Sequence, residues 1–340
     1  TGVFTDKTLK QHYARKWDLQ TAPSICVHCG LGCNTIAGER YGTLRRILNR
    51  YHHEVNGYFL CDRGRFGYEF VNSEKRIKQP MLSPSLFPSP QGRDATSSSP
   101  LAGEDMRRGG EPLHHSSKKA VLGHIAGILS TSKGVIGIGS PRASLESNFA
   151  LRSLVGPDNF YSGMSEPDHR LVSLIIDIHQ KGPARSPSLR DVRMADAVVV
   201  LGEDLTNTAP LLALSLRQAV RGKEFEAAAQ LNIPEWNDAG VRNAGQGARN
   251  PLFIASPANT KLDNLAVKTY QAAPDDIARL GFAVAQELDT SAPAIPGLTG
   301  ETAALAKEIA HFLKKARRPL VISGTSLFNE SIIQAAANVA

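Results

Sequence analysis

The chain has 340 residues, 41% of them hydrophobic and 21% charged, which is enough length for two domains and the composition of an ordinary soluble globular protein. Its apolar runs, such as residues 197–201, are strand-sized and far below the roughly 18 residues that predict a membrane span. No charged-then-apolar leader opens the sequence. We therefore expect a soluble segment, although such a segment can belong to a membrane-attached assembly.

Neither end of the chain has the pattern of a natural terminus. The sequence begins at Thr1, without a methionine, and stops within residues 331–340, which have the pattern of a helix. We expect a piece of a longer polypeptide, in which residues 1–19 lead into the first domain. The net charge of +7 is concentrated near the start, because residues 1–80 carry 13 Lys and Arg against 7 Asp and Glu.

All the cysteines lie in this basic segment, as Cys26, Cys29, Cys33 and Cys61, in the pattern C-x2-C-x3-C-x27-C. Two disulfides are disfavoured, since the first three cysteines are close together and a chain of this length needs no covalent staple. A structural zinc site also uses C-x2-C, but zinc ribbons normally show two such pairs. Three ligands on one loop and one remote ligand suit the four iron corners of a cubane. The pattern favours one 4Fe–4S cluster, with zinc as the alternative.

The residues around the cysteines agree with a cluster. Small glycines let backbone N–H groups approach inorganic sulfide, and the cysteine loop is rich in them (Gly30, Gly32, Gly38). His28 lies within the first C-x2-C and is interpreted as a neighbour of the cluster rather than a ligand. Cations stabilise the negative charge of a thiolate-bound cluster, so the nearby arginines do not require nucleic acid as a partner (Arg45, Arg46, Arg50, Arg63, Arg65).

Residues 20–80 are predicted to form a small, irregular, β-rich domain that binds the cluster. Its strand-like segments are residues 44–48, 58–60 and 68–71, separated by Gly and Asn turns. A domain with so thin a core is expected to depend on its cluster to fold. Residues 81–117 differ in composition, with Ser, Pro and Gly at 17 of the 36 positions 82–117, and are predicted to be a flexible insertion.

From residue 118 onward, apolar strands alternate with helices. The predicted strands are residues 134–140, 196–202, 252–255 and 319–324, and the predicted helices include 143–154, 211–220 and 331–340. This alternation predicts a mainly parallel sheet with both faces covered. Right-handed crossovers then give a Rossmann-like, doubly wound α/β domain over residues 118–340, incomplete at its C-terminal end.

Two loops follow strands of this domain at the position where open α/β sheets bind ligands. Residues 137–142 lack the G-x-G-x-x-G dinucleotide pattern, and a tight turn explains their glycines. In residues 202–210, Glu203 and Asp204 place negative charge where phosphates would lie. The histidine pairs 52–53 and 114–115 are weak metal candidates. No Ser–His–Asp or paired-carboxylate pattern emerges, so we expect neither catalytic nor cofactor-binding residues beyond the four cysteines.

Residues 26–34 (CVHCGLGCN) and 61–68 (CDRGRFGY) resemble the N-terminal cluster motif of the molybdopterin oxidoreductase superfamily. Within it, residues 38–42 (GERYG), 44–47 (LRRI) and the stretch around Cys61 resemble the large iron–sulfur subunits (G subunits) of bacterial NADH:quinone oxidoreductase, respiratory complex I. The resemblance covers about residues 5–80 and 118–340, and its first part carries the specific motifs.

This resemblance implies an iron–sulfur electron-transfer fragment of a proton-translocating oxidoreductase, not catalytic by itself. It implies a place in the peripheral arm, at the cytoplasmic face of the bacterial inner membrane, reaching the membrane only through the complex. The implied partners are the flavin subunit that oxidises NADH and the subunits beside the quinone site, together with a ferredoxin-like region with further clusters. The implied cluster lies off the main electron path, where a relay role and a structural role both stay open.

Molybdopterin is not expected here. Members of the superfamily bind molybdenum through Cys or selenocysteine, or sometimes Ser or Asp, and no fifth cysteine is present. Formate-dehydrogenase-like members carry a lysine two residues after the fourth cysteine, whereas this chain has Arg63, whose hydrogen-bonding geometry differs. The alternatives are the alpha subunit of a formate-dehydrogenase-type molybdoenzyme and a zinc-stabilised scaffold without a redox role.

Overall fold

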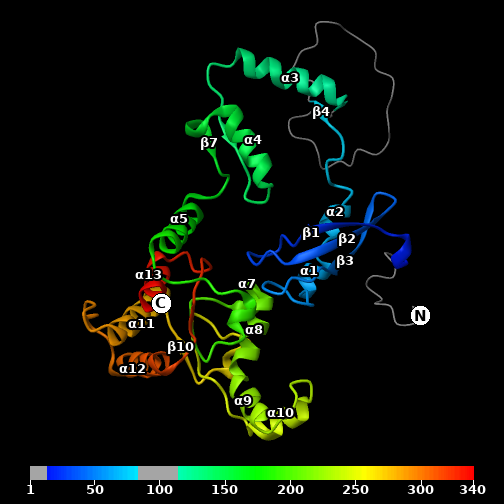
Figure 1. Ribbon diagram of the computed structural model, residues 1–340. Coiled ribbons are helices and arrows are strands. Elements are labelled where there is room, and N and C mark those ends of the chain that lie inside the picture. Colours follow the sequence, from blue (N-terminus) through cyan, green and yellow to red (C-terminus); the bar gives the residue numbers. More distant parts are fainter. Residues whose placement is uncertain (1–13, 83–113) are drawn as a thin grey trace. The chain divides into compact units, whose positions relative to one another are not determined.

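The computed structural model describes residues 14–82 and 114–340 (Figure 1). Most of the predicted insertion at 81–117, and most of the lead-in at 1–19, therefore lie outside the described residues. Contacts divide the chain into two compact units, one made of the residues up to Tyr68 together with Met164–Ala340, and the other of Glu69–Gly163. The predicted domain boundaries stay predictions.

The N-terminal part of the first unit is a three-stranded antiparallel sheet in the order β1-β2-β3, drawn in blue in Figure 1. Its elements are η2 (Lys16–Asp18), β1 (Gln20–Ile25), β2 (Asn34–Arg40) and β3 (Thr43–Asn49). Helix α1 (Asp62–Phe66) lies beside β3. The buried Tyr68 fixes this arrangement, because its hydroxyl donates a 2.7 Å hydrogen bond to the carbonyl of Arg45 in β3.

The sequence prediction for this region is partly confirmed. The strand expected at residues 44–48 is β3. The strands expected at 58–60 and 68–71 are wrong, since residues 58–60 form no strand and the second segment contains helix α2 (Glu69–Asn72). The side chain of Cys61 caps the N-terminus of α1, so a helix begins directly after the first segment. The aromatic residues in both segments favour strands by propensity, and their surroundings override this preference.

The rest of the first unit is built on a four-stranded parallel sheet in the order β10-β9-β8-β11. Its strands are β8 (Ala197–Leu201), β9 (Leu252–Ser256), β10 (Lys268–Gln271) and β11 (Pro319–Ile322). Three of them confirm predicted strands, and β10 was not predicted. The direction of chain progression reverses at β8, which lies next to β9 on one side and β11 on the other.

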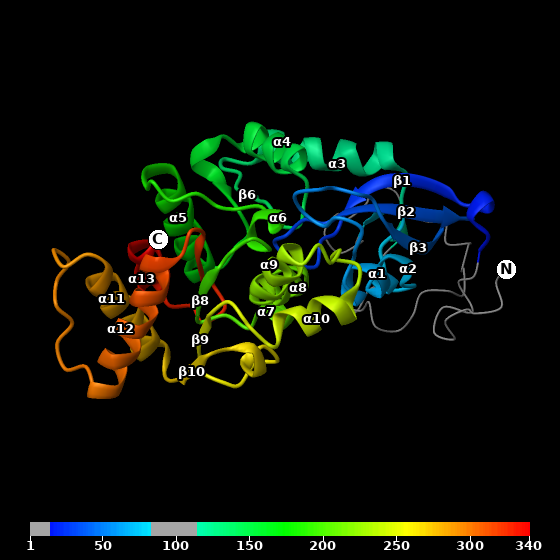
Figure 2. The ribbon, with the colours of Figure 1, turned by 60° about the horizontal axis from the view of Figure 1, so that its bottom comes forward.

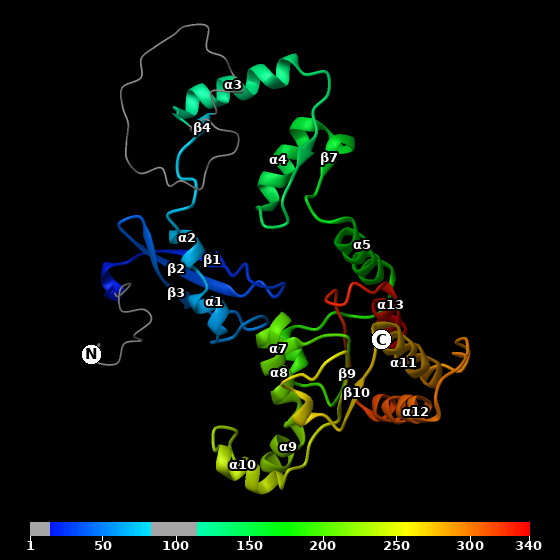
Figure 3. The ribbon, with the colours of Figure 1, turned by 180° about the vertical axis from the view of Figure 1, so that it is seen from behind.

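Helices cover both faces of this sheet, as Figures 2 and 3 show from two sides. On one face, alternate residues of β8 such as Val199 pack with α11 (Pro274–Leu288), α12 (Gly300–Lys315) and α13 (Glu330–Val339). On the other face, Val198 and Val200 pack with α7 (Leu205–Thr208) and α8 (Pro210–Val220). The helices expected at 211–220 and 331–340 are thus confirmed as α8 and α13.

Five further elements in the described residues complete the first unit. They are α5 (Glu166–Lys181), α6 (Leu189–Val192), α9 (Gly222–Gln230), α10 (Asp238–Gly245) and η6 (Asp263–Leu265). An exposed ion pair of 3.5 Å joins Arg170 of α5 to Glu330 of α13.

The second unit consists of two-residue strands and of helices of up to 14 residues. After α2, it contains β4 (Met81–Leu82), β5 (His114–His115), α3 (Lys118–Thr131), β6 (Gly137–Ile138), α4 (Leu145–Val155), η5 (Pro157–Asn159) and β7 (Phe160–Tyr161). The helix expected at 143–154 is confirmed as α4. The strand expected at 134–140 is only β6, because beyond it the amide of Asn148 bonds the backbone N–H and carbonyl of Ser140 and turns the chain. No helix in the described residues is long and apolar enough to cross a bilayer.

The core on the two faces of the sheet predicts that two leucines contribute very differently to the free energy of unfolding. Leu216 of α8 is fully buried, whereas Leu231 is 63% exposed. We expect Leu216→Ala to lower the free energy of unfolding by about 2–5 kcal/mol, because it leaves a cavity, and Leu231→Ala to change it by less than about 0.5 kcal/mol. Urea unfolding followed by circular dichroism measures both, and equal effects would contradict the placement of α8 on the sheet.

Candidate metal centre

Three of the four candidate ligands share the hairpin loop between β1 and β2. The backbone N–H of Cys26 donates a 2.8 Å hydrogen bond to the carbonyl of Cys33, which closes the loop with Cys29 between them. Cys33 is 3% exposed, the other cysteines are half-buried, and all four are free thiols. The disulfide interpretation therefore has no support in this structure.

Cys61 reaches the same region from α1, 28 residues further along the chain. Its sulfur accepts a 3.4 Å hydrogen bond from the backbone N–H of Gly64. A Cβ atom added to Gly64 would lie 3.3 Å from the sulfur of Cys26 and 3.7 Å from that of Cys61. Both sulfurs thus border the same small space, which only a glycine leaves open.

The thiols also interact electrostatically. The pKa of Cys33 is raised to about 12, first by burial and then by the negative charges of Cys29, Cys26 and Cys61. Burial likewise raises the pKa of Cys26, while a backbone hydrogen bond at His28 and the charge of Arg63 act in the opposite direction. Four thiolates this close together repel each other, so the four cysteines can all be ionised only when metal cations lie between them.

The spacing of these groups bears on which metal centre they fit. In the described residues, no three His, Cys, Asp or Glu side chains converge closely enough to hold a single ion. Four sulfurs bound tetrahedrally at the Zn–S distance of about 2.3 Å would lie only about 3.8 Å apart. A cubane takes one thiolate at each of its four iron corners, so its four sulfur ligands lie farther apart than those of one zinc ion. The four free thiols fit a 4Fe–4S cluster, which would take one of them at each iron corner and would supply one-electron redox chemistry when bound.

A buried amide organises the backbone next to Cys33. Asn56 is 5% exposed and accepts a 2.9 Å hydrogen bond from the backbone N–H of Asn34, the residue after Cys33. Its Nδ2 donates to the side chain of Asn49 at 2.5 Å and to the carbonyl of Arg50 at 3.2 Å. This network ties the segment before Cys61 to the cysteine loop. Sequence reasoning missed it, and the recurrence of Asn in the turns was the available signal.

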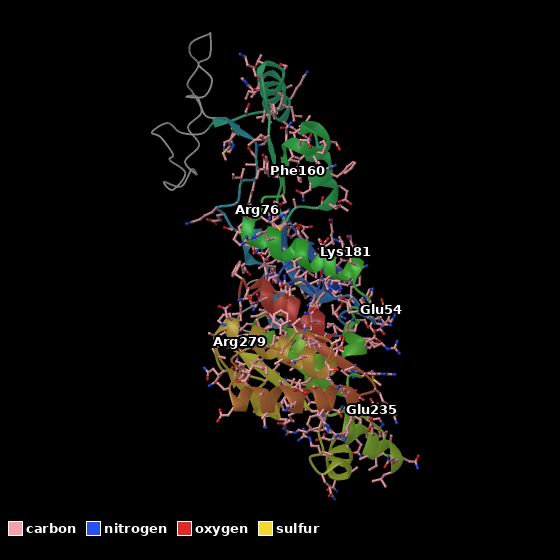
Figure 4. The ribbon with its side chains drawn as sticks, turned by 90° about the vertical axis from the view of Figure 1, so that its left-hand side faces the viewer. Glu54, Arg76, Phe160, Lys181, Glu235 and Arg279 are labelled. Atoms are coloured by element: carbon pink, nitrogen blue, oxygen red, sulfur yellow. The ribbon has the colours of Figure 1, made fainter. Side chains whose placement is uncertain are left out.

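Two further contacts join the cysteine region to the helices of the parallel sheet within the first unit. Arg63 donates through Nη2 to the backbone carbonyl of Asn207 in α7 at 3.0 Å. The carbonyl of Glu54, a residue labelled in Figure 4, accepts a 2.9 Å hydrogen bond from the backbone N–H of Leu189. Arg63 therefore lies between the thiols and α7, and its charge acts to lower the pKa of Cys26.

The rings of His28, His52 and His53 contact neighbouring residues in the structure. The ring of His28 lies against Gly67, at the end of α1, and its Cε1 and Nε2 atoms would be 3.0 Å from a Cβ there. The rings of His52 and His53 stack on each other with centroids 5.7 Å apart. His114 and His115 form the short strand β5.

The two carboxylates of the loop after β8 accept hydrogen bonds from neighbouring residues of the protein. The carboxylate of Glu203, 5% exposed, accepts hydrogen bonds from the backbone N–H of Ser326 at 3.0 Å and from its hydroxyl at 2.7 Å. A Cβ on Gly324 would overlap Glu203 Oε1, so the Glu203 side chain fills the space between the ends of β8 and β11. Asp204 caps α7 through the backbone N–H of Thr206.

Comparison with known proteins agrees with this geometry. Residues 19–73 match the molybdopterin oxidoreductase Fe4S4 domain, a span that includes all four cysteines. The whole chain is 50% identical to the G subunit of NADH-quinone oxidoreductase from Pseudomonas fluorescens, 48% to that from Escherichia coli K12 and 47% to that from Salmonella typhimurium LT2. The resemblance to these large iron–sulfur subunits is confirmed. The chain spans 34–35% of the length of these proteins and aligns over all 340 of its own residues.

In this iron–sulfur domain, Gly64 is expected to be the residue that admits the cluster between Cys26 and Cys61. Gly64→Ala inserts a methyl group 3.3 Å from the sulfur of Cys26. We expect it to weaken iron retention by about 1–3 kcal/mol, as overpacking does. Iron per chain after a timed chelator challenge measures this.

The matched control is Gly123→Ala, also within a helix, where an added Cβ meets no atom within 4 Å. It should retain iron as the unmodified chain does. Equal iron loss in both variants would show that helix propensity, rather than space between the sulfurs, is being measured.

Proposed function

We propose that this chain, as one part of a longer iron–sulfur subunit, binds one 4Fe–4S cluster through Cys26, Cys29, Cys33 and Cys61. It thereby serves as an iron–sulfur electron-transfer part of a bacterial NADH:quinone oxidoreductase. The observation that carries the proposal is the coincidence of two findings. The Fe4S4 domain match spans residues 19–73, and within this span the four thiols are free and share one electrostatic field.

The α/β domain acts as a scaffold without molybdenum chemistry. We assign it to the Rossmann-like, doubly wound architecture of molybdopterin oxidoreductases, and its strand order and two covered faces support this assignment. The position where such a sheet would bind a dinucleotide lies between β8 and β11, and the Glu203 carboxylate takes the donors of Ser326 there. A phosphate would meet a buried negative charge instead of free N–H groups.

The proposed partners follow from the chemistry of the complex to which the relatives belong. A 4Fe–4S cluster carries one electron at a time, and in such a complex it exchanges electrons with redox centres of other subunits. We propose the NADH-oxidising flavin subunit and the subunits on the quinone side as these neighbours, in a peripheral arm on the cytoplasmic face of the bacterial inner membrane. No nucleic acid is required, because the thiolates account for the arginines around them.

Metal analysis of anaerobically purified protein tests the proposal, with Cys61→Ser as the variant. The unmodified chain should contain about four iron and four sulfide, with no molybdenum or zinc. Cys61→Ser should lose the cluster and the folded structure of residues 20–80, because the remote ligand is the one that joins α1 to the cysteine loop.

His28→Ala is the control and should keep its iron. Stoichiometric molybdenum with bound pterin would instead support a formate-dehydrogenase-type enzyme, and one zinc per colourless chain would support a scaffold. Retention of an intact cluster in Cys61→Ser would show that the proposed ligand set is wrong.

A further inference from the structure

The parallel sheet has two edges of opposite character. Edge strand β10 carries Lys268, Thr269 and Gln271 as exposed polar residues, and Lys268 forms an ion pair with Glu308. Such charged edges resist pairing with another strand. Edge strand β11, in contrast, reads Pro-Leu-Val-Ile, and within the described residues it pairs only with β8.

A groove of about 880 Å³ runs beside β11. Its walls are largely apolar, with side chains from α5, α6 and α13 (Ile175, Ile178, Leu189, Val192, Ile333, Ala336). Ser323, directly after β11, also lines the groove, and its hydroxyl is buried without a hydrogen-bond partner among the described residues. An apolar groove along unpaired backbone is the environment that a further β-strand occupies.

The helix that follows β11 indicates where the chain goes next. The step from β10 to β11 runs through α11 and α12, which pack on one face of the sheet, while the opposite step from β8 to β9 runs through α8 on the other face. This is the pattern of right-handed crossovers. Helix α13 packs on the same face as α11 and α12, through Ile332 and Ala336. A strand after α13 must therefore continue in the β10-to-β11 direction, beyond β11.

The end of α13 lies at the groove. Val339 and Ala340, next to the point marked C in Figure 1, are among its lining residues. The chain also accounts for only 34–35% of the length of the NADH-quinone oxidoreductase relatives that it matches.

From these observations we infer that the polypeptide following Ala340 in the full-length protein supplies a fifth parallel strand, which pairs with β11 and fills this groove. The occupant is a segment in cis of about four to six residues. Because apolar side chains of α5, α6 and α13 line the groove, the strand is apolar on both faces, as the fully buried β8 and β9 are. Its backbone removes the open edge, and it brings polar backbone groups to the hydroxyl of Ser323.

Amide hydrogen exchange read by mass spectrometry tests the inference in the full-length protein. We expect β11 to exchange as slowly as the central strand β9, and at least tenfold more slowly than β10, which stays an edge. Exchange of β11 as fast as that of β10 in the full-length protein would overturn the inference, and this comparison needs no truncated protein.

The 340-residue chain supplies the second comparison, with β9 as its folding control. Where β9 is protected, β11 should exchange at least tenfold faster than in the full-length protein, while β10 should be unchanged. Equal protection of β11 in both proteins at low concentration would overturn the inference. So would protection of β11 in the shorter chain that rises with protein concentration and matches the full-length value, because a second copy would then be the occupant.

Discussion

The constraint on which the N-terminal part of this structure depends is the repulsion among four thiolates. Cys33 is 3% exposed, and the charges of the other three cysteines add to its burial in raising its pKa. Ionised together without a metal, these sulfurs would destabilise a domain whose sheet has only three strands. When iron lies between the sulfurs, the four thiolates bind it as ligands and their repulsion is offset. Metal loading and folding of this domain are therefore one process in the proposed function.

Three residues around the cysteines hold the sulfurs in place and reduce the repulsion among their charges. Gly64 leaves space between two sulfurs, and its N–H donates to Cys61. Asn56 holds the backbone beside Cys33 through buried hydrogen bonds. Arg63 opposes the rise in the pKa of Cys26 and at the same time bonds the carbonyl of Asn207. Arg63 thus connects the cysteine region with the parallel sheet, because its guanidinium interacts with the thiols on one side and with a backbone carbonyl on the other.

Much of this could be predicted from the sequence, and the failures have physical causes. Buried strands such as 196–202 and 252–255 were found because a strand covered on both faces is continuously apolar. Strand β10 was missed because an edge strand with Lys268 and Gln271 lacks that pattern. The strand predicted at 68–71 failed because its aromatic residues favour a strand by propensity, whereas Glu69–Asn72 form helix α2. The cysteines were identified by spacing alone, whereas Asn56 and Asn207 act through contacts between distant segments, which a single sequence does not reveal.

Electron paramagnetic resonance of the anaerobically reduced protein, with spins counted against iron, tests the central claim most directly. A single 4Fe–4S cluster held by four thiolates predicts a diamagnetic oxidised state and, on reduction, about one unpaired spin for every four iron atoms. A protein that contains stoichiometric metal but gives no signal after reduction, or whose signal follows molybdenum rather than iron, would contradict the account.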